Sequence, residues 1–504
     1  MLTPQGDPPE PAEATDPPEP PERAERGLVG NAGALLGSRL VKAVLGWGGT
    51  VLIARTLSLE DFGVFSLVFT VLGLMSIVTE FGIGRLAVRG MTSGSDGAPP
   101  DPRFPGSYLM LRIVLGVLGY LVAVGAVAVA GYSAVVVQAT AVAGVVILLA
   151  TPSSAMDVVF QSRMRLGTVA AAETTAITGQ VALTAAIAAA GGSLLWFTLP
   201  AVLYQVIVLC WKAQVARRLV SLRPRVDLPG WRAMLREAIP LSVGSGLATA
   251  YGKVDALLLS KIVGFEAVGI YGVSYKFVDL MEFAATAVTV PLLALLVRHL
   301  PDDRPAAQEE FRRAGLLLAL FAGAAVVGLV GFAEPLTQTL YGADYAAGAD
   351  TTRVLAVAQV FNFVIVLVVC VLIALERNQS YPVMMLFGLA VNLGLNAWLI
   401  PAYEYLGAGI ATLVSNALVA GLAWWLLQRI VPMRVDGVPG CLVAVAVGLG
   451  VAFLGDAWLP WPVAAALAGL SYAAVVVALG LPARAGLPWP PPRPRRRRRA
   501  GSPS

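Results

Sequence analysis

Apolar segments of about twenty residues follow one another from residue 28 to residue 480. A segment of roughly 20 apolar residues is long enough to cross the hydrocarbon core of a bilayer as an α-helix. The chain is 57% hydrophobic and only 13% charged, whereas soluble domains carry about 25% charged residues. The apolar runs are also too long and continuous for the alternating strands of a membrane β-barrel. The sequence therefore predicts an all-α polytopic membrane protein.

Fourteen transmembrane spans are expected. They cover residues 28–54, 62–84, 108–130, 134–158, 169–190, 194–214, 238–262, 268–297, 313–332, 353–375, 382–401, 407–429, 439–457 and 462–480. An even number of spans places both termini on one side of the membrane. Arginines concentrate in the loops after even-numbered spans, and the other loops carry mainly acids. By the positive-inside rule, both termini are predicted to be cytoplasmic. The Ala-, Gly-, Val- and Arg-rich composition fits a bacterial cytoplasmic membrane.

The spans divide into blocks that we treat as domains. Residues 28–215 and 238–430 each hold six spans and are joined by a basic cytoplasmic linker, 216–237, while residues 439–480 form two additional helices. Residues 1–27 are acidic and Pro-rich, and residues 481–504 are rich in Arg and Pro, so both are expected to be disordered cytoplasmic tails. The Arg tail is expected to contact anionic lipids of the inner leaflet. The alternative is that this tail only anchors the topology.

An internal repeat relates the two six-span blocks. The segment LIARTLSLEDFGVF at 52–65 aligns without gaps on LLSKIVGFEAVGIY at 258–271, at a constant offset of 206 residues. Six spans separate the two copies, so the two blocks have the same orientation. Parallel repeats around a site at the membrane midplane are an architecture of alternating-access transporters. Chance similarity between apolar segments is the alternative.

Four basic residues fall inside predicted spans: Arg39 and Lys42 in the first, Lys253 in the seventh and Lys276 in the eighth. A cation at the bilayer centre costs about 2.5–3.5 kcal/mol on insertion scales, so these residues are expected to face a hydrated interior. Arg39 and Lys42 are three residues apart and share one helix face. We predict a central cavity lined by these cations, suited to an anionic substrate and especially to a phosphate. The alternative is internal ion pairing, for example between Lys276 and Asp279.

The remaining cations of the spans have a simpler expected role. Arg55, Lys261 and Arg353 lie at span ends, and Arg112 lies about one turn inside its span. Long basic side chains in such positions extend their charged groups to the membrane surface.

Asp255 lies two residues from Lys253, and positions i and i+2 face different sides of a helix. If Lys253 faces the central cavity, Asp255 points into the second bundle and needs partners there. Span 11 supplies Asn392 and Asn396 on one face, and span 12 supplies Thr412. One carboxylate with amide and hydroxyl oxygens predicts a site for a coupling cation such as Na⁺. Packing of the asparagines between helices is the alternative.

Catalytic groups are scarce in this chain. His299 is the one histidine, and the three cysteines, Cys210, Cys370 and Cys441, are far apart in apolar runs. No metal-ligand spacing and no GxxxxGK[ST] nucleotide-binding loop occurs in the sequence. We therefore expect no enzyme activity, no resident metal or organic cofactor, and no nucleic-acid partner.

Three segments carry a resemblance to a known family. They are LIARTLSLEDFGVFSL at the end of the first span, GIGRLAVRG after the second, and IPLSVGSGLATAYGKVDALLLSKIVGFEAVGIYGVSYKF opening the second block. With them, residues 28 to 480 resemble the polysaccharide and O-antigen (Wzx-type) flippases of the multidrug/oligosaccharidyl-lipid/polysaccharide exporter superfamily. The motifs distinguish this superfamily well and its substrates poorly.

The resemblance implies a fold and a mechanism. It implies two six-helix lobes in a V shape, which rock between inward-open and outward-open states around a polyprenyl-diphosphate-linked oligosaccharide. Lipid II flippases of the same superfamily use span-1 cations in the cavity, which correspond to Arg39 and Lys42. The extra spans, 439–480, would form a groove for the lipid tail. A polysaccharide polymerase and glycosyltransferases are the expected pathway partners.

The resemblance also implies Na⁺ or H⁺ as a coupling ion. The relatives bind a cation through a span-7 Asp, span-11 polar residues and a span-12 Thr, which correspond to Asp255, Asn392, Asn396 and Thr412. One span-11 ligand of the family can be an acid, whereas Asn396 is neutral. A lower ligand charge weakens cation affinity.

Three other functions are open at this point. A lipid II flippase of peptidoglycan synthesis would need the same cationic cavity. A cation-coupled multidrug exporter would need intramembrane acids in its cavity instead. A membrane glycosyltransferase or polymerase would need large loops with catalytic acids, and no loop between predicted spans much exceeds about 25 residues.

Overall fold

The computed structural model describes residues 41–80, 82–92, 101, 103–163, 166–377 and 379–487. Arg39, the acidic tail and most of the Arg tail lie outside these residues. Within the described ranges, ten helices are long and apolar enough to cross a membrane. The described part of the first predicted span is helical over residues 41–56. Each of the other predicted spans overlaps a helix or a helix pair. The prediction of an all-α polytopic fold is confirmed.

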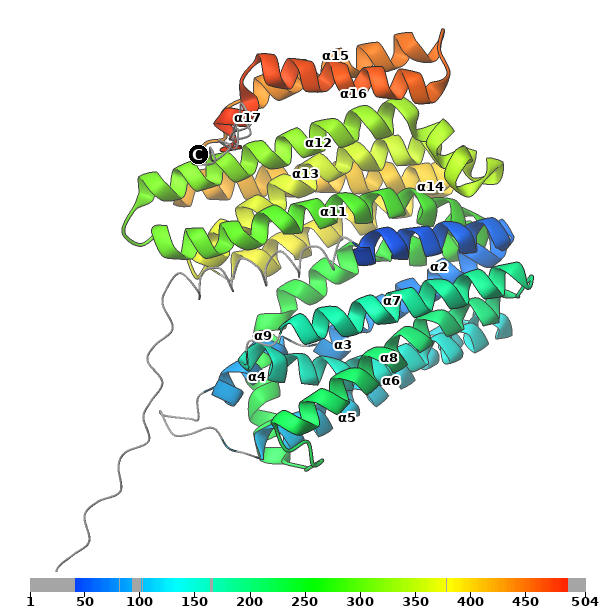
Figure 1. Cartoon of the computed structure of the whole chain (residues 1–504), viewed down its shortest axis with the longest axis vertical. Helices are drawn as coiled ribbons and strands as arrows, with labels where there is room; N and C mark the ends of the chain where they lie inside the picture. The colour runs from blue at the N-terminus through cyan, green and yellow to red at the C-terminus, as the bar shows by residue number, and fades with distance from the viewer. Residues whose placement is uncertain are drawn as a thin grey trace, which may run out of the picture.

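The first six spans form the N-terminal lobe (Figure 1). After the first helix, its elements are α2 (Leu59–Leu74), α3 (Ser76–Glu80), α4 (Ile83–Thr92), α5 (Phe104–Val129), α6 (Ala134–Ser162), α7 (Leu166–Ala189) and α8 (Leu194–Leu219). The second predicted span is divided into α2 and α3 near Met75. Helix α6 packs against α2, α5 and α8, and α7 packs against α8.

The next six spans form the C-terminal lobe. Its elements are α9 (Leu228–Tyr251), α10 (Val254–Ile262), α11 (Phe265–His299), α12 (Arg304–Tyr341), the 3-10 helix η2 (Ala343–Gly348), α13 (Ala349–Ala374) and α14 (Ser380–Ile430). Helix α14 contains both predicted spans 11 and 12, and it turns sharply at Glu404, where φ is 50° and ψ is −128°. Helix α9 already begins at Leu228, so much of the predicted linker 216–237 is helical.

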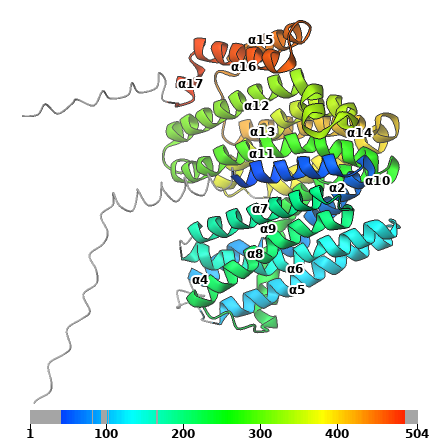
Figure 2. The same cartoon turned by 45° about the vertical axis from the view of Figure 1, so that its right-hand side comes forward.

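The last two spans, α15 (Val438–Asp456) and α16 (Trp461–Ala478), form a hairpin that packs on α12 (Figures 1 and 2). The following residues, predicted as the start of a disordered tail, instead form a short helix, α17 (Leu481–Arg484). Leu481 and Pro482 of this helix are buried, since α17 contacts α12 and α16. The hairpin is therefore attached to the C-terminal lobe.

The two lobes meet where α2 and α11 begin, and the contacts there follow the sequence repeat. A Cβ atom added at Gly63 would lie 1.8 Å from the carbonyl oxygen of Phe265, and one at Gly269 would lie 2.7 Å from that of Leu59. Gly63 and Gly269 are repeat partners, and so are Leu59 and Phe265. Glycine permits this close approach because it has no side chain. The structure thus confirms two repeat-related lobes, which touch through equivalent residues.

Two repeat-related cations connect the lobes at the same end of the molecule. Arg55 donates from Nε to the carbonyl oxygen of Leu340 at 2.7 Å, and from Nη2 to that of Thr339, near the C-terminus of α12. Its repeat partner Lys261 donates to the carbonyl oxygen of Ala130 at 2.6 Å, at the C-terminus of α5. Carbonyls at helix C-termini attract cations. We call Arg55 and Lys261, with the carbonyls that they contact, the reciprocal clamp.

Candidate functional site

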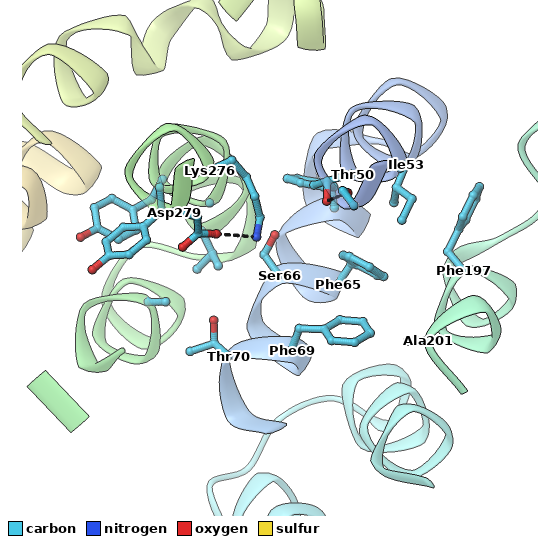
Figure 3. A pocket seen from close by; sticks show the side chains of 18 of the residues that line it. Thr50, Ile53, Phe65, Ser66, Phe69, Thr70, Phe197, Ala201, Lys276 and Asp279 are labelled. Atoms are coloured by element: carbon cyan, nitrogen blue, oxygen red, sulfur yellow. Dashed lines mark hydrogen bonds and ion pairs between the residues drawn. The ribbon is translucent and has the colours of Figure 1, made fainter. Parts of the chain in front are cut away.

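A cavity of about 320 Å³ lies between the two lobes, beside the α2–α11 contact. Its walls come from the first helix, α2, α7 and α8 of the N-terminal lobe, and from α10 and α11 of the C-terminal lobe. Figure 3 shows Phe65 and Phe69 of α2 pointing toward the side of Phe197, whereas Ser66 of the same helix lies beside Lys276, which pairs with Asp279 of α11. The central cavity thus combines an aromatic wall with a charged wall.

Two of the four predicted cavity cations line this central cavity, Lys253 and Lys276, and two carboxylates line it as well, Asp255 and Asp279. Lys276 forms an ion pair with Asp279, which was the alternative to a ligand-binding role for this lysine. Its Nζ lies 2.9 Å from Asp279 Oδ2 (Figure 3). The formal charges of the lining residues balance. The central cavity is therefore not purely cationic.

Lys253 is the cation of this cavity that is available to a ligand. Span 7 was predicted as one continuous helix, but α9 ends at Tyr251 and α10 begins at Val254, so Lys253 lies in the break with φ −128° and ψ −14°. Its stem packs against α2, because a Cβ added at Gly73 would lie 3.2 Å from Lys253 Cε. Its ammonium group has no hydrogen bond or ion pair with any described residue.

The predicted partners of Asp255 come together around it. The Asp255 carboxylate, 2% exposed, accepts hydrogen bonds from Tyr271 Oη at 2.7 Å, Thr412 Oγ1 at 2.8 Å and Asn396 Nδ2 at 2.7 Å. Asn392 completes the set through its Oδ1, which accepts from Asn396 Nδ2 at 2.9 Å. All four residues named from the sequence are therefore in one cluster, which we call the Asp255 cluster. Tyr271 is an additional member.

A hydrogen-bonded chain continues from the Asp255 cluster into the C-terminal lobe. Asn392 Nδ2 donates to Ser415 Oγ at 3.4 Å, and Tyr251 Oη donates to the same Ser415 Oγ at 3.0 Å and to Asn416 Oδ1. The chain ends at a second cavity of about 330 Å³, which Tyr251 and Asn416 line together with Glu282. Polar groups thus connect the central cavity to a cavity inside the lobe.

The donor set of the Asp255 cluster fits a monovalent cation. Asn396 Oδ1 is buried and accepts no hydrogen bond from the described residues. A rotation of that amide would turn Oδ1 toward the Asp255 carboxylate, next to the hydroxyl oxygens of Thr412 and Tyr271. One carboxylate, amide oxygen and hydroxyl oxygens are hard ligands of the kind that alkali and alkaline-earth cations prefer.

Lys42 lies in a different cavity, inside the N-terminal lobe. Its Nζ is 3.3 Å from Glu173 Oε2 of α7 and 5.2 Å from the ring centre of Tyr204 of α8. Behind this pair, Lys212 Nζ lies 2.6 Å from Asp157 Oδ1 and 4.0 Å from Glu173 Oε1. We call Lys42, Glu173, Lys212 and Asp157 the N-lobe charge network.

Sequence reasoning missed most of this network. Lys212 and Asp157 lie at the ends of their predicted spans, and Glu173 lies near the start of span 5. A count of acids against cations within the first six spans would have indicated their pairing. Arg112, expected to reach the membrane surface, is only 4% exposed and donates to the carbonyl oxygens of Thr79 and Thr151. That expectation was wrong because the neighbouring helices α3 and α6 offer acceptors inside the lobe.

Comparison with known proteins finds a family model and a relative that each match part of this chain. A family model described as "polysaccharide biosynthesis protein" matches residues 52–350. An uncharacterised membrane protein of Methanocaldococcus jannaschii is 26% identical over 197 residues, which are 39% of this chain and 46% of that protein. The chain thus spans less than half the length of that relative.

Solved structures share the fold. The lipid II flippase MurJ in an inward closed conformation is similar over 88% of this chain and 98% of that chain, with 14% identity and a TM-score of 0.72. An inward-facing multidrug resistance transporter of the MATE family covers 77% of this chain and 94% of its own, with 13% identity and a TM-score of 0.64. At these identities the likeness shows the fold alone.

Proposed function

Because the chain belongs to the polysaccharide biosynthesis protein family, and has the fold of flippases and exporters of one superfamily, we propose that it is a flippase for a lipid-linked oligosaccharide. Its substrate is a polyprenyl-diphosphate-linked oligosaccharide of surface polysaccharide biosynthesis. Glycosyltransferases supply this substrate and a polymerase consumes the product. The protein resides in a bacterial cytoplasmic membrane with both termini in the cytoplasm.

The observation that carries this proposal is the ammonium group of Lys253 in a cavity between two lobes, where it forms no hydrogen bond or ion pair with a described residue. The diphosphate pairs with Lys253, and Lys42 of the first helix supplies a further cation in the neighbouring N-lobe cavity. Arg39, the other cation predicted from the sequence, lies outside the described residues. Charge-assisted contacts to phosphate are short and strong. The aromatic side of the cavity, with Phe65 and Phe69, packs against the sugar. No covalent chemistry is required, since translocation needs only binding and a change of access.

The reciprocal clamp closes the cavity near the start of α2 and α11, on the side that the positive-inside rule assigns to the outer face of the membrane. Opening there requires that Arg55 and Lys261 release the carbonyls of the opposite lobe. Asp255, Asn392, Asn396 and Thr412, with Tyr271, would hold Na⁺ or a proton. A bound cation would neutralise the one carboxylate of this cluster.

A lipid II flippase or a multidrug exporter would differ in substrate rather than in fold. The carboxylates of Asp255 and Asp279 in the central cavity are the feature that an exporter of organic cations would use. The two substrate classes therefore make opposite demands on Lys253, because a cation at that position repels a cationic drug and attracts a diphosphate.

Replacement of Lys253 tests the proposal. In a host whose own polysaccharide flippase is deleted, Lys253→Ala should lower surface polysaccharide at least about tenfold, since a hydrogen bond to a charged group contributes about 1.5–3 kcal/mol. Lys253→Arg keeps the charge and should retain most of the output. Immunoblots of membranes control for protein level. Wild-type output from Lys253→Ala, or gain of resistance to cationic drugs instead of polysaccharide, would reject the proposal.

A further inference from the structure

Lys42, which the proposed function assigns to the diphosphate, is paired with a carboxylate of the protein. Its Nζ lies 3.3 Å from Glu173 Oε2, and both side chains are partly exposed, 42% for Lys42 and 29% for Glu173. Both residues line a third cavity, of about 220 Å³, inside the N-terminal lobe, and Tyr204 lines it as well. A soluble or lipid-linked anion can therefore reach Lys42, but only in competition with Glu173.

A second lysine, Lys212, lies on the side of Glu173 that faces away from Lys42. Lys212 Nζ lies 4.0 Å from Glu173 Oε1, and its side chain is 3% exposed, so it is out of reach of an incoming ligand. Its other partner is Asp157, at 2.6 Å. Glu173 thus lies between an accessible cation and an inaccessible one.

We propose that Glu173 is an exchangeable counter-anion, which occupies Lys42 in the empty carrier and moves onto Lys212 when the diphosphate binds. This inference rests on the proposed function, because that function assigns Lys42 to the diphosphate. Glu173 does not contact the substrate in this scheme. It is a positioning residue that sets which anions are able to bind.

The exchange selects for ligand charge. Coulomb attraction grows with the product of the charges, so a diphosphate, with more than one negative charge, competes with a single carboxylate for Lys42. A singly charged head group is attracted to Lys42 no more strongly than Glu173 is, so it does not displace Glu173 from Lys42. The N-lobe charge network is neutral in the empty carrier, because Lys42 and Lys212 balance Glu173 and Asp157. Loss of the carboxylate should therefore relax selectivity rather than abolish binding.

The test measures binding of two probes to the purified full chain in detergent. Farnesyl diphosphate supplies the multiply charged head group and farnesoic acid the singly charged one. We expect Glu173→Gln to bind both probes more tightly than the wild type, with the larger gain for farnesoic acid. The ratio of the affinity for farnesyl diphosphate to that for farnesoic acid should then fall several-fold, since a charge pair at this separation contributes about that much to binding. Glu173→Asp, which keeps the network neutral but shortens the reach to Lys42, should shift the ratio in the same direction.

Controls separate the two proposals. Glu334→Gln removes an exposed carboxylate of α12 whose side-chain partner is Gln338, and should leave both affinities unchanged. Thermal melts verify that each variant is folded. If Glu173→Gln and Glu173→Asp leave the affinity ratio at its wild-type value while Lys42→Ala weakens farnesyl diphosphate binding, the exchange is refuted and the diphosphate site stands. If Lys42→Ala and Lys253→Ala both bind farnesyl diphosphate as the wild type does, both proposals are rejected.

Discussion

The carboxylate of Asp255 is surrounded by neutral donors rather than by a cation of the protein. Asn396, Thr412 and Tyr271 each donate to it at 2.7–2.8 Å. Hydrogen bonds from neutral groups stabilise a buried carboxylate but leave its charge uncompensated. At the scale of single residues, this cluster therefore holds a buried carboxylate that forms no ion pair with a basic side chain of the described residues.

The Tyr271 hydroxyl makes the first prediction. Tyr271→Phe removes one of the three donors and should lower the free energy of unfolding by about 1–3 kcal/mol, because the buried carboxylate then lacks a partner. Tyr275→Phe, one helical turn away on α11, is the control, and its hydroxyl has no hydrogen bond to a described residue. Denaturation in detergent measures both variants. Equal free energies of unfolding for Tyr271→Phe and Tyr275→Phe would show that the hydrogen bond from Tyr271 to Asp255 does not stabilise the protein.

The members of the Asp255 cluster could be predicted from the sequence with one exception. Asn392 and Asn396 share one helix face, and the family resemblance grouped them with Thr412 as partners of Asp255. Tyr271 could not be assigned in this way, because its contact with Asp255 depends on the break before α10 and the tight turn into α11. Helical periodicity predicts the direction of a side chain only along a continuous helix. It therefore cannot predict side-chain directions across a break between two helices.

At the scale of helices, the contact of α2 with α11 fixes how near the lobes approach. The close contacts at Gly63 and Gly269 involve backbone atoms, which cannot rotate away as a flexible side chain would. The sequence aligned these glycines as repeat partners but did not indicate that they face each other across the lobes. A repeat defines equivalent positions, whereas their meeting depends on how the two lobes dock.

Substitution of Gly63 tests this contact. Gly63→Ala should force α2 and α11 apart, because its Cβ would lie 1.8 Å from the Phe265 carbonyl oxygen. The expected cost is at least about 1–3 kcal/mol, as for other overpacked positions. Gly48→Ala is the matched control, since nothing lies within 4 Å of its added Cβ, and alanine within a helix stabilises by roughly 0.5–1 kcal/mol. The melting temperature should fall for Gly63→Ala and rise for Gly48→Ala. Shifts in the same direction would contradict the close contact of Gly63 with Phe265.

At the scale of the whole molecule, the reciprocal clamp links each lobe to the other by equivalent residues. The sequence predicted that Arg55 and Lys261 would extend their charged groups to the membrane surface, whereas in the structure these groups bind carbonyls of the opposite lobe. Their acceptors, the carbonyls at the ends of α12 and α5, were not foreseeable, because cation and acceptor belong to different lobes. The fourteen spans and the two lobes were predictable from composition and repeat, whereas the contacts between lobes required the structure.

Loosening the clamp should open this end of the molecule. Spin labels at Val129 of α5 and Ile262 of α10, in a chain whose three cysteines are replaced by serine, report the distance between the lobes. Arg55→Gln with Lys261→Gln should increase the population of long distances several-fold, because each exposed charged contact contributes about 0.2–1 kcal/mol. Arg429→Gln, which removes a contact with Trp425 within α14, is the control. An unchanged distance distribution in the double variant would show that other contacts close this end.

The N-lobe charge network has a consequence for biogenesis. Its four members come from four helices: the first helix, α6, α7 and α8. Each charge adds to the free-energy cost of inserting its helix into the bilayer alone, and that cost is relieved only after the partner helix arrives. Lys212 belongs to the last of the four to be synthesised. The ribosome must therefore deliver α8 before Asp157 and Glu173 acquire their buried partner, so the lobe is expected to assemble in the membrane as one cooperative unit rather than helix by helix.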